Sequence, residues 1–159
     1  MRKYLFVLAI LALLFISSGQ TYEQQSLIPT LERWLPNKPL EGALSTLQIP
    51  YWGRIVSVEE RGYYYFVEFL LRKAAHFFTF GLLAISLYWV LPASRFRTLL
   101  ALFGIVILAI GDEFHQSLTG GRTASSYDVL LDTAGAFTFL MLLKLIQLTR
   151  STSPKRKTA

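Results

Sequence analysis

The chain of 159 residues is too apolar for an ordinary soluble domain, because 53% of its residues are hydrophobic and only 16% are charged, against about 25% charged in soluble domains. It contains no cysteine, which excludes disulfide frameworks, thiolate zinc sites and cysteine nucleophiles. The net charge of +6 comes from basic residues at the chain ends and between apolar runs, so we expect no nucleic-acid partner. Composition predicts a membrane protein whose partner is the lipid bilayer.

Four apolar runs organise the chain. The first, over 4–16, is short, and its flanks fit either a retained transmembrane anchor or a secretory signal peptide cut near Gly19. The others, over 69–91, 99–118 and 127–148, each approach the roughly 20 residues that cross about 30 Å of hydrocarbon. The predicted fold is an all-α, polytopic membrane helical bundle with four transmembrane helices, or three if the N-terminal segment is cleaved.

Basic residues near the ends of short loops predict the orientation. They lie before the first run, between the second and third runs, and after the fourth, which places both termini in the cytoplasm if the first helix is retained. The expected parts are an N-terminal anchor or signal peptide over 1–19, an extracytoplasmic segment over 20–68, a transmembrane core over 69–148 and a disordered basic cytoplasmic tail over 149–159.

The outer segment, residues 20–68, contains prolines that exclude a long helix. A short helix on the bilayer surface and a partly ordered loop both fit it. The aromatic run over 63–66 predicts where the chain enters the membrane again, since aromatic rings favour the headgroup level. A lid formed with Trp34 and Trp52 is a further hypothesis. The apolar residues at helical spacing are Leu27, Leu31, Trp34 and Leu35.

Ionisable side chains occur inside the last three runs, although a charge at the centre of a bilayer costs about 2.5 kcal/mol or more. In this topology all of them lie near the outer ends of their helices, within about 10 Å at a rise of about 1.5 Å per residue. Such groups face the bundle interior and one another, so we expect one polar layer beneath the outer leaflet. Its members are Arg72, Lys73 and His76, then Asp112, Glu113, His115 and Gln116, and finally Asp128 and Asp132.

Helical spacing predicts partners within the polar layer. Asp112 and Gln116 share a helix face, whereas Glu113 points about 100° away and is expected to bond Arg122. Two aspartates of the fourth run are four residues apart and repel each other unless a cation lies between them and their neighbours. The candidates for that cation are Arg72, Lys73 and Arg122.

Small residues in the apolar runs predict close contacts between helices. A shared polar layer requires such close approach. The fourth helix is expected to start with Ser125 or Ser126 as its N-cap. The small residues are Gly81, Gly104, Gly111, Gly135, Ala84, Ala134 and Ala136.

Several motifs occur in a fixed order in the second half of the chain. They are RKAAHF over 72–77 with GLL over 81–83, DEFHQ over 112–116, GR over 121–122, and the stretch 128–135. Together they resemble the VanZ-like family of bacterial integral membrane proteins. The resemblance implies a small multi-helix protein of the bacterial cell envelope, in a family whose founding member is associated with low-level resistance to the glycopeptide teicoplanin.

The resemblance implies no settled activity, and any cofactor is unknown. Thr79 and Asp132 depart from the family pattern, where a carboxylate and an asparagine are common. The motif positions carried over as binding residues are Arg72, Lys73, His76, Asp112, Glu113, His115, Gln116, Arg122 and Asp128.

Three interpretations of the polar layer stay open. It could be purely structural, a set of interhelical bonds worth about 0.5 to 2 kcal/mol each. It could bind an anionic lipid or a lipid-linked cell-wall precursor at the outer leaflet, with the N-termini of the second and fourth helices beside its cations. It could be a membrane-embedded hydrolase or transferase, although the spacing matches no zinc signature and no metal site is assigned. The catalytic candidates are His76, Asp112, Glu113 and His115.

Overall fold

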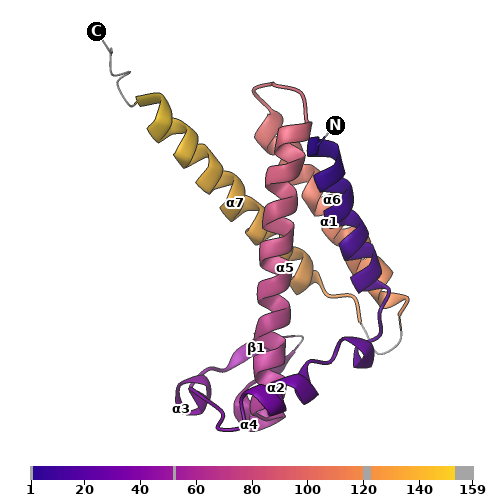
Figure 1. The fold of residues 1–159 in the computed structure, drawn as a ribbon, viewed down its shortest axis with the longest axis vertical. Helices are drawn as coiled ribbons and strands as arrows, with labels where there is room; N and C mark the ends of the chain where they lie inside the picture. The colour runs from indigo at the N-terminus through magenta and orange to yellow at the C-terminus, as the bar shows by residue number, and fades with distance from the viewer. Residues whose placement is uncertain (1, 52, 120–122, 153–159) are drawn as a thin grey trace.

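The computed structural model describes residues 2–51, 53–119 and 123–152. Its bundle consists of α1 (Arg2–Ser18), α5 (Tyr63–Val90), α6 (Arg97–Ser117) and α7 (Ser126–Thr152), as Figure 1 shows. The helices α5, α6 and α7 are long and apolar enough to cross a membrane, and α1 is a shorter apolar helix. The predicted all-α membrane bundle is confirmed. Because α7 continues to Thr152, the first residues of the predicted disordered tail are helical instead.

The outer segment folds into short elements that gather around the start of α5 (Figure 1). They are η1 (Glu23–Gln25), α2 (Ile28–Trp34), α3 (Glu41–Leu44), β1 (Ile49–Tyr51), β2 (Arg54–Val56) and α4 (Val58–Arg61). Of the two forms that fitted the apolar spacing here, a short helix or a loop, the structure has the helix α2, which buries Leu31. The antiparallel hairpin of β1 and β2, with Tyr51 opposite Arg54, was not predicted. Its turn contains Gly53 at a φ of 67°, a conformation that glycine adopts without steric cost.

The helix α5 begins at Tyr63, six residues before the predicted start at residue 69. The aromatic run at its start is used to hold the outer segment. The Tyr63 hydroxyl donates to the Pro39 carbonyl at 2.8 Å, and the Tyr64 hydroxyl donates to the Leu35 carbonyl at 3.1 Å. Burial of apolar rings and these bonds extend the helix beyond its membrane-spanning part.

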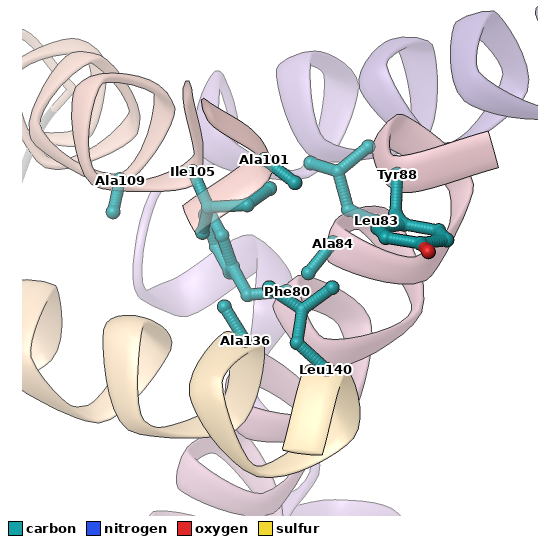
Figure 2. Packing of buried hydrophobic residues seen from close by; sticks show 9 residues of the cluster. All are labelled: Phe80, Leu83, Ala84, Tyr88, Ala101, Ile105, Ala109, Ala136 and Leu140. Carbon is teal, nitrogen blue, oxygen red and sulfur yellow. The ribbon is translucent and has the colours of Figure 1, made fainter. Parts of the chain in front are cut away.

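An apolar core fills the space between α5, α6 and α7, as Figure 2 shows. The helix α1 packs against this core with part of its apolar surface. The core therefore lies in the C-terminal half of α5, after the ionisable residues of its first half, and it reaches Tyr88 near the end of the helix. Its buried members are Phe80, Leu83, Ala84 and Tyr88 of α5, Ala101, Ile105 and Ala109 of α6, and Ala136 and Leu140 of α7.

Glycines set the distance between helices, as their small size predicted. A Cβ atom at Gly135 of α7 would lie 2.2 Å from the backbone carbonyl oxygen of Phe77 in α5, so the two backbones touch here. A Cβ at Gly81 would lie 2.6 Å from the ring of Phe139. By contrast, no atom lies within 4 Å of a Cβ placed at Gly111. Beyond the contact at Gly135, α7 diverges from α5 toward its C-terminus (Figure 1).

Candidate functional site

Two polar pairs join α5 to α7 at the end of the bundle that faces the outer segment. The Lys73 ammonium bonds to the Asp128 carboxylate. Further along both helices, Nδ1 of His76 lies 3.3 Å from Oδ1 of Asp132. Lys73 precedes His76 by three residues and Asp128 precedes Asp132 by four, so the pairs lie about one helical turn apart. Each aspartate of α7 thus has one basic side chain of α5 beside it, and the Lys73 ammonium offsets the charge of Asp128.

The Lys73 pair is completed by Tyr51 from β1, a residue that the sequence did not single out. The Tyr51 hydroxyl donates to Oδ2 of Asp128 at 2.5 Å, accepts from Lys73 at 2.8 Å and lies 3.2 Å from Oγ of Ser125. Burial, with the hydrogen bond to Asp128, raises the pKa of Tyr51 above its usual value of 10.0. The hydroxyl therefore stays protonated and remains a donor to Asp128 at neutral pH.

Arg72 does not lie between the two aspartates of α7, so that possible placement is wrong. Its Nη2 lies 2.6 Å and its Nε 2.8 Å from Oε1 of Glu68, one turn earlier on α5. The same guanidinium donates to Oε1 of Gln25 at 3.0 Å and to the Tyr22 carbonyl at 3.3 Å. Because Arg72 and Lys73 are adjacent in a helix, they point about 100° apart. One faces the outer segment and the other faces α7.

Glu68 is the last residue of the predicted outer segment, 20–68, yet its side chain is fully buried. Its Oε2 accepts from the Ser26 hydroxyl and from the Leu27 backbone N–H, both at 3.1 Å. Burial and the charge of Glu68 raise the pKa of Tyr22 to about 12. The signal that could have identified Glu68 is its spacing of four residues from Arg72, which is the spacing of a helical ion pair.

The polar residues of α6 mostly face α1. Asp112 accepts a hydrogen bond from the Ser18 hydroxyl and another from Nε2 of Gln116 at 2.6 Å. The predicted shared face of Asp112 and Gln116 is therefore confirmed. The His115 ring stacks on Phe15 of α1, with ring centroids 4.5 Å apart. These contacts hold α1 on α6. In the part of the chain that the structure describes, no three histidine, aspartate or glutamate residues are grouped to hold a metal.

Glu113 lies between α6 and the start of α7. Its side chain is buried, and Oε2 accepts from the backbone N–H of Ser125 at 2.7 Å. Ser125 immediately precedes α7, so this bond fixes where the helix begins. Arg122, the predicted partner of Glu113, lies outside the described residues. Glu113 thus serves a neighbour different from that of Asp112, as its angular offset predicted.

Four buried side-chain atoms in the described ranges have no hydrogen-bond partner: Nδ1 of His76, Oε1 of Glu113 and both carboxylate oxygens of Asp132. The Asp132 side chain is fully buried, and its contact with His76 lacks hydrogen-bond geometry. Buried polar atoms in proteins are nearly always paired. Packing alone therefore does not explain why these three side chains of the polar layer are buried.

The structure addresses the lid hypothesis for Trp34 alone, and it gives Trp34 no part in a lid. The Trp34 side chain is 73% exposed and covers none of these residues, and Trp52 lies outside the described residues. Tyrosines of the outer segment reach the cations instead: the Tyr51 ring lies 4.4 Å from the Lys73 ammonium, and the Tyr22 ring lies 4.6 Å from the Arg72 guanidinium. Aromatic faces attract cations at such distances, so the outer segment does contact the polar layer.

No curated protein and no solved structure matches this chain. A family model described as VanZ/LLP1 matches residues 3–147, a range that includes all four bundle helices and every predicted site residue. With the three apolar spans, this match makes the protein a multi-pass membrane protein. The match confirms the resemblance that the motifs indicated: the chain belongs to the VanZ/LLP1 family.

Proposed function

We propose that this VanZ-like protein binds the phosphate of an anionic lipid or lipid-linked cell-wall precursor in its polar layer, at the outer leaflet of the bacterial plasma membrane. The observation that carries the proposal is the position of Lys73. Its ammonium has three donors, and the described contacts, to Tyr51 and Asp128, use two of them. Its side chain is 23% exposed. A fixed, partly exposed ammonium with a remaining donor is suited to a phosphate oxygen.

The carboxylates of the polar layer do not oppose an anion as strongly as their number suggests. Glu68 is paired with Arg72, and Asp128 with Lys73. Asp112 accepts from Ser18 and Gln116. A protonated His76 beside Asp132 would add a second cation one turn from Lys73. Since Glu68, Asp112 and Asp128 are engaged with partners inside the bundle, the cations can act on a ligand at its rim.

Only one helix N-terminus supports the phosphate. The helix α7 begins at Ser126, within one turn of Asp128, and its first N–H groups favour an anion. By contrast, α5 begins at Tyr63, about 15 Å before Lys73 at about 1.5 Å per residue. The expectation that two helix N-termini flank the ligand is therefore reduced to one. Arg72, whose donors reach Glu68, Gln25 and Tyr22, becomes a positioning residue for the outer segment.

The orientation is part of the proposal. The buried acidic side chains lie at the polar layer, whereas the opposite end of the described bundle carries Lys3, Arg97 and Lys144. An excess of lysine and arginine marks the cytoplasmic side of membrane proteins. The polar layer then faces outward, and both termini are cytoplasmic with α1 retained. A cell-wall precursor bound there would connect the protein to glycopeptide resistance of the teicoplanin type.

Mass spectrometry of the full chain, purified in mild detergent, tests the binding proposal. Wild-type protein should retain phospholipid or polyprenyl phosphate, and Lys73→Gln should lose most of it. Lys38→Gln is the matched control, because Lys38 is an exposed lysine of the outer segment that forms its ion pair with Glu41 and contacts no residue of the polar layer in the described contacts. Equal lipid retention in Lys73→Gln and wild type would reject the proposal. In a teicoplanin-susceptible bacterium, expression of wild type but not of Lys73→Gln should raise the inhibitory concentration.

A membrane-embedded hydrolase or transferase is the second candidate, favoured by the His76–Asp132 pair. A histidine beside a buried carboxylate is the arrangement of a general base, in which the carboxylate orients the ring. Purified protein should then release phosphate from a lipid phosphate monoester, and His76→Gln and Asp132→Asn should each abolish release while lipid stays bound. If wild-type protein releases no phosphate from such lipids, this candidate is removed and the binding proposal remains.

A further inference from the structure

Three cations from three different helices surround the C-terminal end of α5, at the end of the bundle away from the polar layer. Lys3 of α1 donates to the carbonyl of Trp89 at 3.3 Å. Arg97 of α6 donates from Nε to the carbonyl of Tyr88 at 2.5 Å, and Lys144 of α7 donates to the Tyr88 hydroxyl at 3.1 Å. We call these three cations, with Tyr88, the basic cluster.

Tyr88 is the common contact of the two innermost cations. Its side chain is buried, the Arg97 guanidinium lies 4.4 Å from its ring centroid, and the Lys144 ammonium lies 4.9 Å from it. Aromatic faces attract cations at such distances, so the Tyr88 ring favours the position of both charges. The two cations therefore converge because the protein places them together.

Capping of α5 explains only part of this positive charge. The C-terminus of a helix carries the equivalent of about half a negative charge, and cations near it often bond the last carbonyls. Three cations exceed that charge several-fold. All four ion pairs among the described residues lie elsewhere, at the polar layer or in the outer segment. The basic cluster thus keeps a net positive charge that no carboxylate offsets within the described bundle.

The cations also keep hydrogen-bond donors for a ligand. A guanidinium has five N–H donors and an ammonium three, and the described hydrogen bonds use one on Arg97 and one on Lys144. Arg97 is in addition the first residue of α6, where the N–H groups of the first turn favour an anion. Both side chains are only partly buried. The donors, the charge and the helix start all favour the same class of ligand, a phosphate.

We propose that the basic cluster binds the phosphate of an anionic phospholipid from the leaflet at this end, which is the cytoplasmic leaflet in the proposed orientation. Basic pockets between transmembrane helices on that side bind anionic headgroups in other membrane proteins. Exposed apolar side chains beside the cluster, such as Leu100 of α6 and Leu145 of α7, supply a surface for the acyl chains. A lipid therefore fits this site better than a soluble phosphate. This site is separate from the polar layer.

Native mass spectrometry of the full chain, titrated with phosphatidylglycerol and with phosphatidylcholine, tests the inference. Wild type should bind phosphatidylglycerol more tightly. Each basic residue contributes roughly five-fold to such binding, so Arg97→Gln and Lys144→Gln should each weaken it about five-fold. Arg95→Gln is the matched control. Arg95 is an exposed arginine two residues before α6, and it contacts Phe96 instead of Tyr88. It should change binding less than two-fold.

Three outcomes would overturn the inference. Equal affinity for the two lipids, or an equal loss in Arg95→Gln, would reduce the cluster to general surface charge and overturn it. Displacement of phosphatidylglycerol by millimolar inorganic phosphate would show that the cluster binds soluble phosphate, and it would overturn the proposal that its ligand is a lipid. Circular dichroism checks that each variant is folded. Tyr88→Phe, which keeps the ring and removes the hydroxyl that Lys144 contacts, should reproduce a smaller loss in the same direction.

Discussion

The two ends of α5 differ in the partners of their basic side chains. At the polar layer, Lys73 and Arg72 each meet a carboxylate, the first on α7 and the second within α5. At the basic cluster, Arg97 and Lys144 meet a carbonyl, a hydroxyl and an aromatic ring. The apolar core lies between them. The first end pairs its cations with carboxylates and the second does not, although both are built on the same helix.

This difference shows which contacts hold the bundle together. Across the polar layer, charges of opposite sign connect α5 with α7 and the outer segment, so removal of one partner leaves a buried charge unpaired. Across the basic cluster, loss of one cation leaves no carboxylate without its partner. We therefore expect changes at the polar layer to affect stability, and changes at the basic cluster to affect lipid binding. Four predictions test this comparison.

The largest effect is expected from Gly135→Ala, which should destabilise the protein by about 3 kcal/mol. The added methyl group would lie 2.2 Å from the Phe77 carbonyl oxygen, which belongs to a helix backbone and cannot rotate away. The pairs that join α5 to α7 would separate with it. Unfolding by sodium dodecyl sulfate, followed by circular dichroism, measures the change.

Gly111→Ala is the matched control for this prediction. It introduces the same methyl group into a membrane helix, where no atom lies within 4 Å of it. Its unfolding curve should stay close to that of the wild type. If the two variants unfold alike, the backbone contact at Gly135 is not what holds α7 against α5.

Glu68→Gln should destabilise the protein by about 2 kcal/mol, less than the loss of a fully buried pair because Arg72 is partly exposed. The change also weakens acceptance from Ser26 and Leu27, so the outer segment should loosen. Thermal unfolding and the rate of trypsin cleavage after Arg33 report the two effects. Glu32→Gln alters an exposed glutamate and should change neither; an equal response would contradict a special role for Glu68.

Tyr51→Phe should cost about 1 kcal/mol, because it removes one hydroxyl that donates to Asp128 and accepts from Lys73. The ring and its contact with the ammonium remain. Thermal unfolding in detergent measures the loss. Tyr127→Phe removes the hydroxyl of an exposed neighbouring tyrosine and serves as the control; a larger loss there would show that the Tyr51 hydroxyl is not the connection.

The smallest effect is a pH dependence from Tyr22. Its pKa rises from 10.0 in the unfolded chain to about 12 in the folded protein, so the folded state holds the proton more tightly. Stability from this group is complete below pH 10 and is lost as pH rises from about 10 through about 12. Tyr22→Phe should make the fall in stability over this window shallower. An unchanged slope in alkaline unfolding curves would contradict the raised pKa.

The sequence predicted the spans and the polar layer because both depend on one-dimensional information. A run of about 20 apolar residues has few alternatives to a membrane helix, and a charge within it has few alternatives to the bundle interior. Partners were harder to predict. Tyr51 and Ser18 lie in or beside the outer segment, where polar residues are ordinary, and only the hairpin and the end of α1 bring them to Asp128 and Asp112.

The partner of Arg72 was missed for a different reason. The spacing between Glu68 and Arg72 was present in the sequence, but Glu68 had been assigned to the outer segment because the apolar run begins at residue 69. The helix continues past the apolar run as far as Tyr63. Hydropathy identifies the apolar part of a helix. The tyrosines at the start of α5 have low hydropathy, so the apolar run does not include them although the helix does.

The unequal lengths of α1 and α5 have a consequence for the surrounding lipid. The 17 residues of α1 rise about 26 Å and the 28 residues of α5 about 42 Å, whereas hydrocarbon is about 30 Å thick. A short helix accommodates this mismatch by thinning the bilayer beside it. We expect such thinning to bring headgroups and water closer to Ser18 and to Asp112, which Ser18 contacts. A charge near an interface costs less than one at the bilayer centre, so the short first helix would lower the cost of placing Asp112 inside the bundle.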